Sequence, residues 1–148
     1  MEKINLEFTR RRKDDDGHEI IDKATYSKLT KNFIKSGGII IRGEVAKEHL
    51  KNSGAYASYI NGANVAFITD NATVSDVLEE MYHAKQDKAN MFGELTNRKI
   101  LYQREIAAQK YLINVAEKYK IPEEEVVVTK ENLKFYIEQL KKFLESGE

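Results

Sequence analysis

The chain has 148 residues, of which 41% are hydrophobic, and this is enough for one domain with a buried core. Its 24 lysines and arginines balance 24 aspartates and glutamates, so the zero net charge gives no overall attraction to nucleic acid or an anionic membrane. Because the sequence contains no cysteine, thiolate metal sites are excluded, and any metal must be held by histidine or carboxylate side chains. No membrane-spanning apolar run and no signal peptide are visible, so we expect neither a membrane protein nor a secreted one.

The first 36 residues are predicted to form a charged arm and a short helix. In the arm, residues 1–18, a basic block stands next to an acidic one and indicates a solvated turn: Arg10-Arg11-Arg12-Lys13-Asp14-Asp15-Asp16-Gly17. The adjacent aspartates make this block a poor footprint for phosphates. Apolar residues at helical spacing then predict a helix over about residues 22–36, which Gly37-Gly38 ends.

The middle of the chain is predicted to form a small antiparallel sheet. Ile39-Ile40-Ile41 is typical of a short buried strand, and residues 44–52 of a small helix. Residues 56–60 and 65–69 flank Asn61-Gly62, and this dipeptide between two apolar stretches is a strong signal for a β-hairpin.

The C-terminal half is predicted to be helical. A helix begins at Thr73, where Asp76 three residues later partly mimics a capping box, and a long helix covers about residues 97–120. Pro122 starts a further element, and Thr129 is expected to cap a last helix. The fold class is therefore α+β, with the sheet preceding a helical C-terminal half.

The most informative motif is E-E-x-x-H at residues 79–83. It matches the zincin pattern H-E-x-x-H with the first ligand changed to Glu79. Helical periodicity places Glu79 and His83 one above the other, while Glu80 lies about 100° around the helix, where it could reach a water without binding the metal. Glu105, 22 residues after His83 and on the next predicted helix, would supply a third ligand and leave a position open for water.

The motif and the other two histidines also allow interpretations that involve no zincin-like site. Glu79 and His83 could form an ordinary i,i+4 surface pair, and a ferritin-like di-iron site would need a second E-x-x-H and four long helices, which are not visible. The string His18-Glu19-Ile20-Ile21-Asp22 resembles a zincin motif superficially but has no convincing helix or third ligand. His49 is expected to be a surface or partly packed histidine.

Beyond the motif, a longer set of residues resembles a known family. Gly37-Gly38-Ile39-Ile40-Ile41, the hairpin, residues 77–86 and residues 104–112 resemble the zincin-like metallopeptidase toxin domains. Similar domains occur at the C-termini of phage minor head proteins and in bacterial polymorphic toxins. The resemblance covers roughly residues 37–145 and implies a zincin-like metallopeptidase domain at residues 37–148.

The resemblance also implies roles for individual residues. Glu79, His83 and Glu105 would bind the metal, Glu80 would be the general base, and the remaining matched polar residues, Gln86 and Gln109, would orient the ligands. The cofactor is one divalent metal, expected to be zinc, with manganese or iron as alternatives because the ligand set is rich in oxygen. Two carboxylate ligands would also lower the pKa of a bound water less than histidines do.

Two functional hypotheses follow. As an enzyme, the chain would be a metal-dependent peptidase, toxin-like or phage-associated, with its protein or peptide substrate along the sheet edge at residues 65–69. As a catalytically inactive module with the same fold, it would bind phage head proteins or another partner. The expected location is the cytoplasm or a phage virion. The expected origin of the chain is a phage or another mobile element. A toxin would have an immunity protein as a further partner, and neither nucleic acid nor membrane is expected as one.

Overall fold

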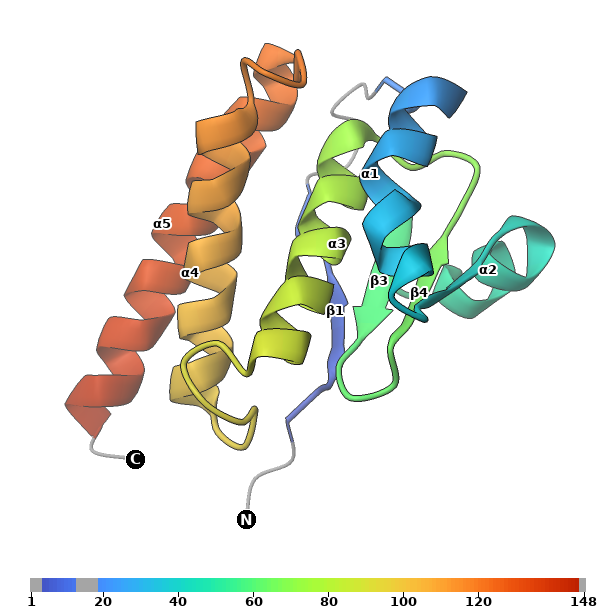
Figure 1. Cartoon of the computed structure of the whole chain (residues 1–148). Coiled ribbons are helices and arrows are strands. Elements are labelled where there is room, and N and C mark those ends of the chain that lie inside the picture. Colours follow the sequence, from blue (N-terminus) through green and yellow to red (C-terminus); the bar gives the residue numbers. More distant parts are fainter. Residues whose placement is uncertain (1–3, 13–18, 147–148) are drawn as a thin grey trace.

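The computed structural model describes residues 4–12 and 19–146, and its centre is a four-stranded sheet (Figure 1). The strands are β1 (Glu7–Thr9), β2 (Ile39–Ile41), β3 (Ala57–Ile60) and β4 (Val65–Ile68), in the spatial order β1-β3-β4-β2. β3 pairs antiparallel with both β1 and β4, whereas β2 runs parallel to β4. The sheet is therefore mixed, not antiparallel as expected. An isolated apolar triplet such as β2 has no tight turn to its partner, so its sequence carries no information on strand direction.

The hairpin predicted around Asn61-Gly62 is confirmed. Gly62 and Asn64 both adopt left-handed backbone conformations, with φ of 86° and 57°, which glycine and asparagine tolerate. The Asp87 carboxylate accepts hydrogen bonds from the Gly62 amide at 2.7 Å and from the Tyr59 hydroxyl at 2.6 Å. These contacts fix the hairpin against the helix that carries the candidate ligands.

Two expectations about the sheet edges are wrong. Residues 65–68 form β4, which lies between β3 and β2, so the two edges of the sheet are β1 and β2. β2 is also less buried than predicted, since Ile39 is 58% exposed. An apolar run shows that a strand is favoured but does not show which neighbours will cover it.

The N-terminal arm was expected to be solvated, and residues 7–10 contradict this, whereas Arg11 is exposed. Residues 7–9 form β1, Phe8 is only 3% exposed, and Arg10 is 4% exposed. Their burial depends on partners far along the chain, which a local charge pattern cannot reveal. Residues 13–18, the rest of the basic and acidic blocks with His18, lie outside the described residues.

The described residues form five helices: α1 (Lys23–Lys35), α2 (Gly43–Leu50), α3 (Val74–Ala89), α4 (Arg98–Val115) and α5 (Glu123–Ser146). The predicted capping box is present at the start of α3, where Thr73 and Asp76 exchange side-chain and backbone hydrogen bonds. Thr129 was expected to cap a helix, but it lies inside α5. Its hydroxyl donates a hydrogen bond to the carbonyl of Glu125 one turn earlier. Threonine can make this bond without ending a helix.

Helix α3 is the central helix of the fold (Figure 1). It packs against α1 and the sheet, and also against α4, while α4 and α5 lie side by side. The main core joins residues of the sheet, α1 and α3, among them Phe8, Phe33, Tyr59, Ile68, Val77 and Met81. Within residues 4–12 and 19–146, no helix is both long and apolar enough to cross a membrane.

Candidate metal centre

Glu79 and His83 on α3 and Glu105 on α4 come together as the motif predicts. One possible ligand atom from each residue lies within 4.8 Å of the other two, and all three side chains are buried. His83 Nε2 lies 3.0 Å from Glu105 Oε1 and 4.0 Å from Glu79 Oε2. A short chain segment brings α4 back against α3, so the second helix presents its carboxylate to the same point.

Gln86 determines which nitrogen of His83 faces the other two residues. Its amide Nε2 donates to the carbonyl of Arg104 at 2.8 Å, so its Oε1 must be the atom that faces His83 Nδ1, also at 2.8 Å. This oxygen can only accept, so Nδ1 carries the hydrogen. In the neutral ring Nε2 then holds the lone pair, which is the form that binds a metal. Gln86 therefore has the orienting contact that the resemblance implies.

Arg10 is a site residue that the sequence did not reveal. Its guanidinium lies 3.1 Å from Glu79 Oε1, and it also donates to the Glu125 carbonyl at 3.0 Å and the Thr129 hydroxyl at 2.9 Å. Both partners of the ion pair are buried. The pair leaves Glu79 Oε2 directed at His83 and holds the side chain in one orientation.

Glu80 lies in the same buried region, and neither carboxylate oxygen has a hydrogen-bond partner among the described residues. Burial, together with the charges of Glu79 and Glu105, raises its pKa well above the ordinary 4.5. Gln109 is also fully buried with both amide atoms unpartnered, and no hydrogen bond joins it to any of the three ligand residues. Its predicted orienting role thus has no contact to support it.

Tyr136 is a second residue that sequence reasoning missed. It lies on α5, where its helical spacing only indicated a core position, and it is buried. Burial raises the pKa of its hydroxyl, and the charges of Glu105 and Glu79 and a hydrogen bond with Glu105 raise it further. Helix α5 therefore closes the candidate site from the side opposite to the sheet.

The residues present fit a single divalent cation. Among the described residues, His83 Nε2 and Glu105 Oε1 have no partner except each other, at 3.0 Å, and either a proton on Nε2 or a cation between them would satisfy both buried atoms. One imidazole and two carboxylates are a donor set that zinc, manganese and iron all accept. The charge also fits, because the carboxylates of Glu79, Glu80 and Glu105 together formally balance a dication and the Arg10 guanidinium.

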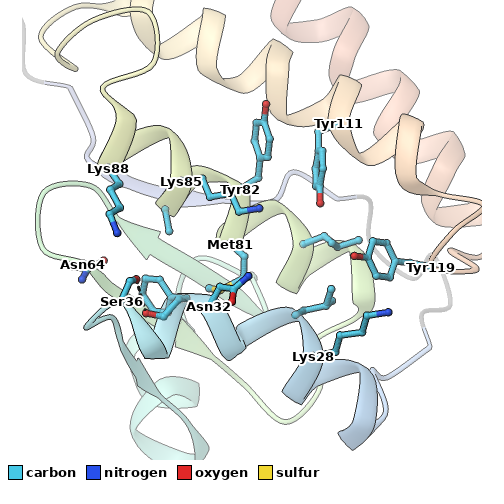
Figure 2. Close-up of a pocket in the computed structure, with 14 residues that line it drawn as sticks. Lys28, Asn32, Ser36, Asn64, Met81, Tyr82, Lys85, Lys88, Tyr111 and Tyr119 are labelled. Carbon is cyan, nitrogen blue, oxygen red and sulfur yellow. Dashed lines mark hydrogen bonds between the residues drawn. The ribbon is translucent and has the colours of Figure 1, made fainter.

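The site is closed to solvent in this conformation. Glu79, Glu80 and His83 are at most 1% exposed, and neither they nor Glu105 line any of four surface pockets in the described part of the chain. Figure 2 shows one of them, a groove with Tyr82, Lys85 and Lys88 of α3 on its wall. None of the candidate ligands lines this groove, so it is not an entrance to the candidate metal centre.

The alternative histidine sites gain no support from the structure. Asp22 of the string at residues 18–22 accepts a hydrogen bond from the Thr25 amide and caps α1. The ring of His49 stacks on Phe67 with centroids 3.8 Å apart, and its Nε2 lies 2.8 Å from Glu7. His49 is thus a partly packed surface residue, as expected.

Comparisons with protein-family models, with curated proteins and with solved structures found no match to this chain. The function therefore has to be argued from the geometry of the site.

The buried carboxyl groups predict an unusual pH dependence for the metal-free fold. Burial, partly offset by Arg10, raises the pKa of Glu79 to about 7. Burial opposes protonation of His83, but the nearby carboxylates of Glu105 and Glu79 outweigh it and raise its pKa above 6.5. Together with Glu80, these groups make the folded state bind more protons than the unfolded state above about pH 4.5.

We therefore expect the free energy of unfolding, measured in chelator, to fall as the pH rises from about 5 to about 8. The slope should approach about 1.4 kcal/mol per pH unit for each such group at pH values between its pKa in the unfolded state and its higher pKa in the folded state. Urea unfolding at each pH measures it, and Glu80→Gln should reduce the slope. A flat or rising profile would contradict the assignment of protonated carboxyl groups in the metal-free core.

Proposed function

We propose that this chain is a metal-dependent hydrolase of the peptidase class, with one divalent ion held by Glu79, His83 and Glu105. The observation that carries the proposal is a buried imidazole and two buried carboxylates that converge, with His83 Nε2 and Glu105 Oε1 having no partner but each other in the described part of the chain. Buried polar atoms without partners are costly to a fold, so their retention favours a ligand that satisfies them.

The chain's own residues support hydrolysis in three ways. Glu80 is adjacent in sequence to a ligand but is not one, and its unpartnered carboxylate can accept a proton from water. Gln86 holds His83 in the metal-binding tautomer, and Arg10 fixes the orientation of Glu79. When bound, a divalent ion would polarise a substrate carbonyl and lower the pKa of water.

The proposal includes kinship with the zincin-like metallopeptidase toxin domains. The support is that E-E-x-x-H lies on a helix packed against a mixed sheet and that the third candidate ligand comes from the next helix. Zinc is the first metal to test, with manganese and iron as alternatives.

One observation favours the second candidate, a catalytically inactive module that binds phage head proteins or another protein. Glu80 and His83 are fully buried and β1 occupies the sheet edge nearest to them, so a substrate cannot reach them without a rearrangement. In this case the ion, if bound, would only stabilise the fold.

Elemental analysis of protein purified without added metal or chelator tests the metal centre, on which the hydrolase proposal depends. We expect about one equivalent of a divalent metal per chain, as three protein ligands imply. Hydrolysis of unstructured polypeptides by the loaded protein then separates enzyme from module. Absence of metal, even after incubation with zinc, manganese and iron, would overturn the metal centre itself.

A further inference from the structure

Residues 7–12, here called the N-terminal segment, run as an extended chain across the candidate metal centre. β1 pairs antiparallel with β3, Glu7 opposite Ile60 and Thr9 opposite Ser58. Between them, the ring of Phe8 stacks on the ring of His83, with centroids 4.0 Å apart and planes 19° from parallel. The segment therefore occupies the position at which an added strand would bring a peptide backbone next to the candidate catalytic residues.

The Arg10 side chain lies in a fully formed subsite. Besides its ion pair with Glu79, the guanidinium donates to the Glu125 carbonyl and the Thr129 hydroxyl of α5. These three acceptors come from two helices that the segment separates, and a guanidinium with several donors in one plane is suited to such a set. The subsite would not be satisfied by an apolar side chain.

The next two arginines each have their own subsite. The Arg11 guanidinium lies 3.4 Å from the centroid of the Phe135 ring. Arg12 donates to the Asp76 carboxylate at 2.7 Å, and its guanidinium also lies 4.5 Å from the centroid of the Tyr56 ring. Aromatic faces and carboxylates both favour arginine over lysine.

The backbone of the segment is held as well. The Asn132 side chain on α5 donates to the Arg11 carbonyl at 2.8 Å. On its other side the segment forms backbone hydrogen bonds with β3. It therefore lies between β3 and α5, and Phe8 packs on His83 of α3. An extended chain with both main-chain and side-chain recognition is how peptide-binding grooves work.

We infer that the groove filled by residues 7–12 is a binding site for extended peptides with consecutive arginines, and that the chain's own segment is its intramolecular ligand. The inference deepens the proposed function, since it assigns a basic peptide as the substrate class. It rests on the proposed function, because the bound peptide is a substrate only if the chain is a hydrolase. The acidic residues Glu79 and Asp76 set the charge preference of the groove. The segment has only a three-residue strand in the sheet, so a competing peptide must displace few backbone hydrogen bonds.

The test uses the full chain with Arg11→Ala and Arg12→Ala together. These changes weaken the hold on the segment but leave the subsites on Phe135, Asp76 and Tyr56 intact. The probe is a fluorescent peptide with the sequence of residues 5–12, and the control peptide has glutamine in place of its three arginines. Anisotropy titrations are run in chelator, so the result does not depend on metal binding.

We expect the double variant to bind the arginine peptide at least about tenfold more tightly than the wild-type chain does, and at least about tenfold more tightly than it binds the glutamine peptide. Hydrogen exchange at the Phe8 and Thr9 amides should be faster in the double variant than in the wild type. A matched variant, Lys130→Ala with Lys134→Ala on exposed positions of α5, loses the same charge and should behave as the wild type.

Two results would overturn the inference. A folded double variant with fast exchange in β1 that binds neither peptide would show that the segment is only structural, and equal binding of both peptides would remove the arginine subsites. If the double variant does not fold, Asn132→Ala loosens the backbone of the segment and serves in its place. If the chain binds metal but no peptide, the inference about the groove fails and the proposed metal centre stands. If it binds the arginine peptide but no metal, the metal centre fails and the groove stands.

Discussion

Purified His83→Ala protein is expected to contain less than about a tenth of an equivalent of metal, against about one equivalent in the wild type. The substitution removes the only nitrogen among the three ligands, whereas loss of an orienting partner alone already costs roughly 10–100-fold in metal affinity. Elemental analysis measures the content, and calorimetric titration of the metal-free proteins measures the affinity. Gln86→Leu, which keeps all three ligands but loses the contacts to His83 Nδ1 and to the Arg104 carbonyl, should fall between the two.

Two controls make this result specific. His49→Ala removes a histidine outside the cluster and should keep the wild-type metal content. Because His83→Ala also removes the ring that packs on Phe8, the near-isosteric Glu105→Gln tests the same site with little change of volume. Wild-type metal affinity in folded His83→Ala protein would contradict the assignment of the metal centre.

Glu80→Gln is expected to keep the metal and to lose hydrolysis. The amide has the shape of the carboxyl group but cannot take a proton from water, and general base catalysis contributes roughly 10²–10⁴-fold. We expect kcat for an arginine-containing peptide to fall by about this factor, with metal affinity within about threefold of the wild type. The measurement is a single-turnover or steady-state cleavage assay on loaded protein.

The matched control is Glu124→Gln, a carboxylate on the exposed first turn of α5, which should leave the rate unchanged. Unchanged cleavage in Glu80→Gln would remove the general base from the proposed function. Hydrolysis that is absent in every variant, with metal present in the wild type, would favour the inactive binding module.

Local sequence patterns anticipated a large part of the site. The i,i+4 spacing of Glu79 and His83 and the capping box at Thr73 are properties of one helix, and both are present in α3. Glu105 on the following helix was predicted as the third member, and it lies 3.0 Å from His83. The predictions within α3 succeeded because helical periodicity and capping depend on residues within one or two turns, whereas the position of Glu105 depends on how α4 packs against α3.

The errors have a different physical origin. The direction of β2, the place of β4 inside the sheet and the continuity of α5 through Thr129 all depend on which distant elements pack together. An apolar or threonine-containing stretch is compatible with several such arrangements, and tertiary contacts select one of them.

The amino-acid sequence by itself determined the α+β class, the hairpin and the presence of a Glu-Glu-x-x-His helix with a later glutamate. Only the tertiary structure decided that Arg10, 69 residues before Glu79, reaches that carboxylate and that Glu80 is buried without a partner. The reason is that burial and long-range ion pairs arise from the packing of elements remote in sequence. Arg10, which local criteria place in a solvated block, thus becomes buried when a sheet edge and two helices close around it.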